Sequence, residues 1–291
     1  MDDSTDTSRI SPTAHYTGYV WVRNGLSDKN MATLHGRAFY TALRPGMWAG
    51  RVLLGISDVE TVLLQRHLMI DHLLEKAVEE KGVGQILELA VGLSPRGFRL
   101  ARRFAGTGMR YVEADLPSMA LRKRRALVRQ GLMGKDHRVV ECNILEPTGP
   151  RSLSGIAKTH LRPGVPTAVV TEGLINYFPT SDMAGMWSDI AGVLENQGGG
   201  VYLTDAFLHR RTHLMYPVVL GWIKFLEVFA RGRIHLHFDS NEQAVERMKR
   251  LGFDEARVHA PESFANVLDI PFTRLRSLAS VIEAEVEPGR G

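Results

Sequence analysis

Apolar and polar residues alternate along this chain with two different periods. Between residues 59 and 80, apolar positions recur every three or four residues, which is the spacing of one helix face. Beyond Gly82, short apolar runs alternate with helical segments, a pattern typical of βαβ units with parallel strands. The predicted strands are 85–90, 109–114, 138–142, 167–171 and 200–204, with 257–260 and 278–284 as a closing pair, and the predicted helices between them are 96–104, 118–131, 153–160, 181–195 and 241–251.

This alternation predicts an α/β fold with a Rossmann-like, doubly wound sheet in one domain over residues 83–291. A mainly apolar helical insertion is expected at 208–238, after the fifth strand. Residues 10–82 form an expected helical cap and pre-sheet helix, and the aromatic residues at the start of this segment predict packing against the main body. The polar residues 1–9 are expected to be a disordered tail.

Composition narrows the class of protein. The 291 residues are 44% hydrophobic and 23% charged, which excludes collagen-like and wholly disordered chains. A net charge of +4 is too small by itself to argue nucleic-acid binding. The single cysteine, Cys142, excludes an internal disulfide and fits a reducing compartment. No signal peptide is visible, and the apolar stretch 214–230 contains Lys224 and Glu227, so a cytoplasmic protein without stable membrane insertion is expected.

Candidate ligand-binding residues follow the first two strands, because ligands of open α/β sheets bind outside the carboxyl ends of the strands. Gly92 allows a close approach to the backbone, whereas Ala90 stands where a dinucleotide-binding turn has glycine. This disfavours NAD and suits a ligand without phosphates. Asp115 ends the second strand, where an acidic residue usually holds a ribose diol. The alternative is that Asp115 caps the helix that begins near Pro117.

The third and fourth strands also end in polar residues. Asn143 follows the third strand and can present its amide to an adenine edge. Glu172 follows the fourth strand, and Gly173 and Tyr177 come soon after it, which indicates an active-site wall. Because desolvating a lone carboxylate costs several kcal/mol, Glu172 is expected to meet a cation or a hydrogen-bond donor.

Three motifs in this order resemble those of a known family. They are Glu-Leu-Ala-Val-Gly-Leu-Ser-Pro-Arg-Gly-Phe-Arg-Leu at 88–100, Tyr-Val-Glu-Ala-Asp-Leu-Pro at 111–117 and Thr-Glu-Gly-Leu-Ile-Asn-Tyr-Phe at 171–178. The chain resembles the class I S-adenosylmethionine-dependent methyltransferases, in the branch of leucine carboxyl methyltransferase and the bacterial polyketide O-methyltransferases. The segment 10–21 is similar to a bacterial subgroup of that branch. The resemblance covers most of residues 10–260 and implies a seven-stranded sheet, with the last strand antiparallel and the cofactor across the strand ends.

The resemblance also implies roles for individual residues. Arg66 matches an arginine that clamps the methionine carboxylate, Asp115 the ribose-binding acid, and Glu172 an acid near the methionine amino group or the substrate mouth. Asn143 stands where the family usually has aspartate near the adenine. The complete cofactor-binding set implied in this way is Arg66, Glu88, Ala90, Gly92, Asp115, Leu116, Asn143, Ile144 and Glu172. In the first motif, Ala90, Ser94 and Pro95 depart from the more usual Gly-x-Gly-x-Asp-Thr-Arg.

Methyl transfer is an in-line displacement at the sulfonium methyl, so the enzyme mainly positions the two reactants. A carboxylate acceptor is ionised at neutral pH and needs no base, whereas a phenol requires a proton acceptor. The candidate catalytic residues, mainly for positioning, are Glu172, Tyr177, His15 and Tyr16, and the topology also places His209 and His213 near the site. No metal is expected, because the pair His235 and His237 has no third ligand in view.

The sequence therefore predicts an O-methyltransferase acting on a small apolar or aromatic acceptor, a carboxylate first and a phenol next. One alternative is an RNA methyltransferase, suggested by the basic run 122–125, although a solvated helix face explains such a run more simply and no nucleic-acid partner is expected. Another is a non-catalytic cofactor-binding scaffold, suggested by Ala90 and Asn143. The stretch Leu214–Ala230 can roof the substrate pocket or support a homodimer.

Overall fold

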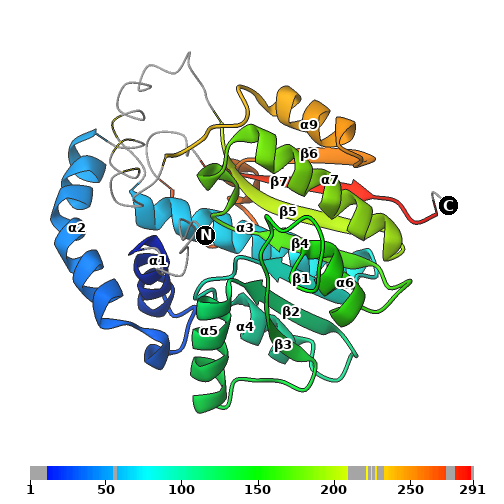
Figure 1. Ribbon diagram of the computed structural model, residues 1–291. Helices are drawn as coiled ribbons and strands as arrows, with labels where there is room; N and C mark the ends of the chain where they lie inside the picture. The colour runs from blue at the N-terminus through cyan, green and yellow to red at the C-terminus, as the bar shows by residue number, and fades with distance from the viewer. Residues whose placement is uncertain are drawn as a thin grey trace, which may run out of the picture.

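Seven strands form one sheet with helices on both faces in the computed structural model (Figure 1). The structure describes residues 12–54, 58–208, 221, 224, 227, 233–272 and 279–289. The strands are β1 Gln85–Leu89, β2 Arg110–Asp115, β3 His137–Glu141, β4 Thr167–Thr171, β5 Gly200–Phe207, β6 Glu255–His259 and β7 Ala279–Val286. The α-helices are α1 Pro12–Arg23, α2 Leu34–Leu54, α3 Val59–Glu80, α4 Arg96–Arg103, α5 Pro117–Arg129, α6 Leu153–His160, α7 Thr180–Asn196 and α9 Asn241–Arg250. Three 3-10 helices are η1 Lys29–Met31, η2 Ile175–Tyr177 and η3 Pro261–Phe264.

The strand order is β3-β2-β1-β4-β5-β7-β6, and only β7 runs antiparallel to its neighbours. The predicted seven-stranded sheet with an antiparallel last strand is therefore confirmed. From β1 the chain continues to β2 and β3 on one side and returns to β4 on the other. The order thus reverses between β1 and β4, and such a switch point is where open α/β sheets bind ligands.

Alternating side chains of the strands divide the core into two layers. Leu87, Val112 and Val169 face the layer built with α6, α7 and α9. Ile86 and Tyr111 face the opposite layer, which α3 and α4 complete. Each central strand is buried on both faces, as expected for parallel strands between helices.

The first two helices and α3 form a smaller aromatic core beside the sheet. Tyr16 and Trp21 of α1 and Tyr40 of α2 pack with Leu63 and Leu64 of α3. Tyr16, Trp21 and Tyr40 thus pack against the main body, as the aromatic density of this segment predicts, whereas Trp48 is 65% exposed. In Figure 1, α2 forms the outer edge of this cap and α1 lies between α2 and the sheet.

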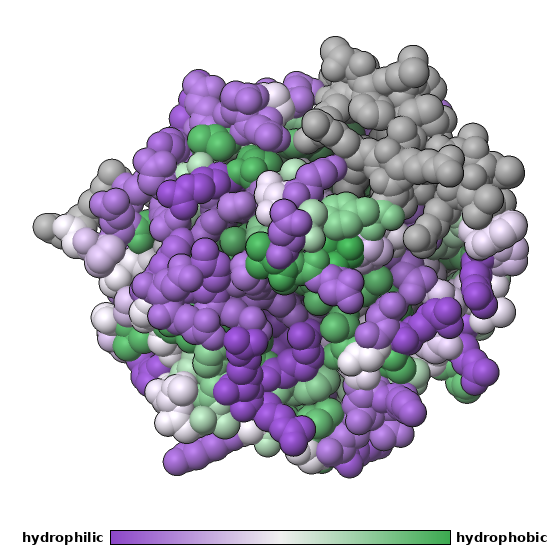
Figure 2. All heavy atoms as spheres, turned by 180° about the vertical axis from the view of Figure 1, so that it is seen from behind, coloured by the Kyte–Doolittle hydropathy of each residue, from purple (hydrophilic) through white to green (hydrophobic). Residues whose placement is uncertain are grey.

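Other expectations fall outside the part of the chain that the structure describes. These are the tail 1–9, His209 and His213, and nearly all of the apolar stretch 214–230 with its suggested homodimer contact. Among the described helices, none combines the length and apolar character that crossing a membrane requires. On the face shown in Figure 2, hydrophilic side chains surround small groups of apolar ones.

Candidate cofactor and active site

A cavity of about 330 Å³ opens at the carboxyl ends of β1, β2 and β4, beside the switch point of the sheet. The loops after these strands form one wall and α1 forms another. A volume of about 300 Å³ or more is typical of small-molecule sites. The lining residues are Thr13, Ala14, Thr17, Gly18, Trp21, Arg66, Glu88, Ala90, Val91, Gly92, Leu93, Ser94, Asp115, Leu116, Ser118, Met119, Glu172, Gly173 and Tyr177.

Asp115 is held at the end of β2 by two backbone donors. The N–H of Gly92 donates to Oδ2 at 2.7 Å, and the N–H of Leu116 donates to Oδ1 at 2.7 Å. Burial raises the pKa of Asp115, although these two donors oppose the shift. The helix α5 begins at Pro117 without a side-chain cap, so the alternative that Asp115 caps this helix is wrong. Its carboxylate instead joins the loops after β1 and β2.

The turn after β1 adopts backbone conformations that favour glycine. Gly92 has a φ of +52°, and Ala90 has the same value. Glycine adopts this left-handed conformation readily, whereas L-residues other than Asn and Asp rarely do. A Cβ at position 92 would lie 3.8 Å from the Cβ of Ala14 in α1. At position 18, a Cβ would lie 3.1 Å from that of Leu93, so α1 sits directly against this turn.

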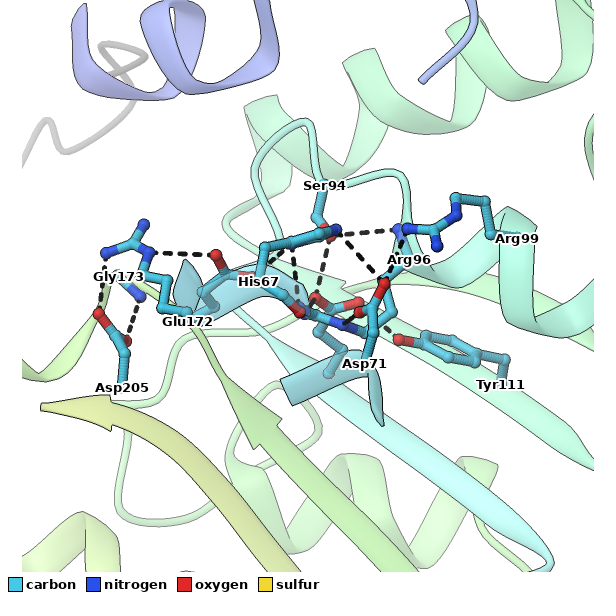
Figure 3. Close-up of polar contacts among 11 residues, drawn as sticks. His67, Asp71, Ser94, Arg96, Arg99, Tyr111, Glu172, Gly173 and Asp205 are labelled. Atoms are coloured by element: carbon cyan, nitrogen blue, oxygen red, sulfur yellow. Dashed lines mark hydrogen bonds and ion pairs between the residues drawn. The ribbon is translucent and has the colours of Figure 1, made fainter. Parts of the chain in front are cut away.

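A network of buried charges lies beneath the cavity, and Arg96 is at its centre (Figure 3). The guanidinium of this fully buried residue pairs with Asp71 at 2.5 Å, Glu88 at 2.6 Å and Glu172 at 2.7 Å. The hydroxyl of Tyr111 donates to Glu88 at 2.7 Å. Sequence reasoning missed the role of Arg96, since nothing in the pattern shows that an arginine at a helix start is buried.

Glu172 meets the cations that its position at the end of an apolar strand predicts. Its carboxylate contacts Arg66 Nε at 3.1 Å and His67 Nδ1 at 2.8 Å, in addition to Arg96. Burial alone would favour the protonated form, but His67, Arg96 and Arg66 together hold the pKa of Glu172 well below its usual range. The ring of His67 stacks on Trp21 of α1 with centroids 4.2 Å apart. The carboxylate is therefore ionised at neutral pH and held by three side chains.

Arg66 lies at the cavity wall between two carboxylates. Besides Glu172, its Nη1 contacts Asp205 of β5 at 2.8 Å. The second oxygen of Asp205 accepts the N–H of Gly173 at 2.6 Å, where φ is +68°. Burial raises the pKa of Asp205, and Arg66 opposes that shift. The sequence also gives no sign of the role of Asp205, because a carboxylate after an apolar run looks like the end of the strand, which is predicted to stop at residue 204.

Four residues of the predicted set lie away from the wall of this cavity. On α1, the helical period turns Thr13 and Thr17 toward the cavity. The other side of the helix carries His15, which binds the Thr33 hydroxyl at 2.9 Å. Tyr16 contacts Met47 Sδ at 3.5 Å. Asn143 and Ile144 follow β3, and they do not line the cavity either. The roles assigned to His15, Tyr16, Asn143 and Ile144 stay predictions.

The basic run in α5 is not a uniformly solvated face. Lys123 is fully buried and pairs with Glu113 at 2.7 Å, whereas Arg122, Arg124 and Arg125 are exposed. Among the described residues, no group of three or more potential metal ligands occurs.

Residues 51–191 match the family model of leucine carboxyl methyltransferase. A proposed methyltransferase from Thermobifida fusca has a similar structure, with a TM-score of 0.64 at 13% identity over 97% of both chains. A DUF574 family protein from Streptomyces avermitilis gives a TM-score of 0.62 at 13% identity, over 97% of this chain and 99% of its own. An O-methyltransferase family protein from Burkholderia thailandensis gives 0.50 at 16% identity, over 99% and 75%. No protein of curated function matches the sequence.

The fold and the family match together define a class I S-adenosylmethionine-dependent methyltransferase. Within that class, the similarity is to leucine carboxyl methyltransferase, over a segment that contains Arg66, Glu88, Asp115 and Glu172. The cofactor of this class is S-adenosylmethionine.

The charges of the cavity wall suit this cofactor. Among the described lining residues, three carboxylates face one guanidinium, Arg66. S-adenosylmethionine carries an ammonium, a sulfonium and one carboxylate, so its net positive charge complements that wall. The buried carboxylate of Asp115 suits hydroxyl donors. The residues present therefore fit the cofactor.

Proposed function

We propose that this enzyme methylates the carboxylate of a small apolar or aromatic acid, forming a methyl ester. The observation that carries this proposal is the absence of histidine from the described cavity wall, where the carboxylate of Glu172 is ionised and paired with Arg66 and Arg96. A phenol or alcohol needs a group that removes its proton, whereas a carboxylate is already ionised at neutral pH. A carboxylate acceptor therefore needs only to be held in line.

The proposed cofactor contacts follow from the charges of the wall. The carboxylate of Asp115 holds the ribose hydroxyls, and Glu88 and Glu172 face the positively charged methionine portion. Arg66 uses Nε and Nη1 for Glu172 and Asp205, which leaves Nη2 for the methionine carboxylate. When bound, S-adenosylmethionine supplies the methyl group activated by its sulfonium. The ion pairs of Arg96 keep the acidic side chains in place before the reactants arrive.

The acceptor is proposed to lie against α1 and η2. Thr13 and Thr17 of α1 and Tyr177 of η2 line this side, and the Tyr177 hydroxyl donates to Thr13 Oγ1 at 3.5 Å. Tyr177 is 39% exposed, so its ring is available to an apolar ligand. In this account Tyr177 positions the acceptor, and Glu172 acts through its fixed negative charge.

The chemistry is tested by incubating the enzyme with methyl-labelled S-adenosylmethionine and matched pairs of aromatic acids and phenols of the same ring size. We expect label in a product that mild alkali converts to labelled methanol, because esters are cleaved under conditions that leave aryl ethers intact. The dependence of kcat/KM on pH should be flat between about pH 6 and 8, since an acid acceptor has a pKa near 4.

The opposite results identify the rivals. Alkali-stable label in phenols, with kcat/KM rising tenfold per pH unit, would contradict carboxylate methylation. Label in added RNA, suppressed steeply by salt, would indicate the RNA methyltransferase alternative. Asp115→Asn serves as the control, because weaker cofactor binding should lower transfer to every acceptor by the same factor.

A further inference from the structure

A second buried charge cluster joins β2, β3 and α5, next in sequence to the cavity-lining residue Asp115. Lys123 of α5 and Glu113 of β2 are fully buried, with Nζ 2.7 Å from Oε1, and His137 Nε2 of β3 lies 3.3 Å from the other oxygen of Glu113. None of these three side chains lines the cavity. Replacing a buried ion pair by apolar residues is often neutral or stabilising, so stability alone does not account for this pair.

The pair encloses the part of the chain that builds the cavity wall. Between Glu113 and Lys123 lie Asp115, Leu116, Ser118 and Met119, which all line the cavity. The ion pair therefore joins the two ends of this short segment and fixes α5 relative to β2.

The loop on the other side of Asp115 is tied to the same pair. Gly97 is the second residue of α4, just after the cavity-lining turn, and a Cβ there would lie 2.0 Å from Glu113 Oε1 and 2.9 Å from His137 Nε2. The start of α4 thus rests directly on Glu113. Gly92 in that turn donates the hydrogen bond that holds Asp115. Both partners of the Gly92–Asp115 hydrogen bond therefore belong to segments anchored on Glu113.

We infer that Lys123 and Glu113 are positioning residues that align Asp115 with Gly92 for cofactor binding. This inference rests on the proposed role of Asp115 in the cofactor site, and it is independent of the acceptor. Lys123 and Glu113 touch neither reactant. They act by fixing the two segments whose relative position sets the shape of the ribose-facing wall.

The test is the double variant Lys123→Met/Glu113→Gln, which removes both charges of the pair and keeps a side-chain amide next to His137. Calorimetric titration with S-adenosylhomocysteine should show binding weakened roughly tenfold, the equivalent of one charge-assisted hydrogen bond. The KM for S-adenosylmethionine should rise by a similar factor while kcat changes less than threefold. A matched control is Lys81→Met/Glu283→Gln, which removes a 2.6 Å ion pair elsewhere in the protein and should leave cofactor binding unchanged.

Wild-type affinity in a folded double variant would overturn the inference. If that variant fails to fold, the single variant Gly97→Ala, which presses on Glu113, provides the second measurement, with the same expected loss and the same contradicting result. Asp115→Asn separates the proposed role of Asp115 from the positioning role of Lys123 and Glu113. Wild-type affinity in Asp115→Asn would refute the proposed role of Asp115 itself, whereas a loss there without a loss in the double variant would refute only the positioning role.

Discussion

Replacing Arg96 by methionine tests whether its ion pairs hold the site together. The substitution keeps most of the apolar volume and removes the charge that joins Asp71, Glu88 and Glu172. Asp71 keeps Arg99 at 2.7 Å, and Glu172 keeps Arg66 and His67. Among the described residues, the partners that remain for Glu88 are neutral donors, the hydroxyls of Tyr111 and Ser94.

One fully buried carboxylate is thus left without a cation. Breaking a buried pair in this way costs about 3–5 kcal/mol, a large share of a typical total of about 5–15 kcal/mol. At roughly 2–4 °C per kcal/mol for a chain of this size, Tm should fall by about 6–20 °C. Differential scanning calorimetry at pH 7.5 measures this change, and Arg103→Met, whose side chain is 50% exposed, is the matched control with an expected loss below about 1 kcal/mol.

The difference between wild type and Arg96→Met should also depend on pH. In the folded wild type, the pKa values of Asp71 and Glu172 are lowered by neighbouring cations that outweigh burial. Their stabilisation is therefore complete above the unfolded pKa of about 4 and is lost as pH falls below it. The gap in Tm should be nearly constant between about pH 7 and pH 5 and narrow as pH falls from about 4 toward 2. A fall in Tm of less than 2 °C at pH 7.5, or a gap that stays the same down to about pH 2, would contradict this role of Arg96.

Three further predictions concern single side chains. Ala90→Gly should raise stability by about 0.5–1 kcal/mol in urea denaturation, because glycine adopts the φ of +52° without the strain that alanine bears; an unchanged midpoint would contradict this. Gly97→Ala should lower stability by about 1–3 kcal/mol, since its Cβ overlaps Glu113 Oε1, and a wild-type midpoint would show that the contact yields freely. Glu283→Gln should lower the free energy of unfolding by roughly 2–3 kcal/mol at pH 7. Burial opposes ionisation of Glu283, but His259 and Lys81 outweigh it and lower its pKa to about 2. The difference from wild type should vanish as pH falls from 4.5 toward 2, and a difference that does not depend on pH would exclude this cause.

The regular part of the fold could be predicted from the sequence because each element has a clear period and clear ends. The helix over 59–80 and the strand over 167–171 agree with α3 and β4 residue by residue. The fifth strand is longer than predicted, since it continues to Phe207 through Asp205. Its last residues pair with β7, and a pairing partner so distant in sequence leaves no local signal.

The site could be predicted only where a strand end fixes a residue's position. Asp115 and Glu172 follow strands directly, so the topology brings them to one edge of the sheet. The partners of Glu172 come from α3 and α4, and no local pattern shows which arginines of a helix are buried. His15 could not be placed in this way, because the side of α1 that faces the cavity depends on how the helix packs against Leu93. Only the tertiary structure determines that packing.

The cofactor site is tested most directly by a calorimetric titration of S-adenosylhomocysteine into the wild-type enzyme and into Asp115→Asn. We expect saturable binding at one site per chain in the wild type. Binding to the variant should be weaker by about 1–3 kcal/mol, the cost of a lost hydrogen bond to a charged group. Failure of the wild type to bind would contradict the assignment of the cofactor to this enzyme, and equal affinities would contradict the assignment of Asp115 to its site.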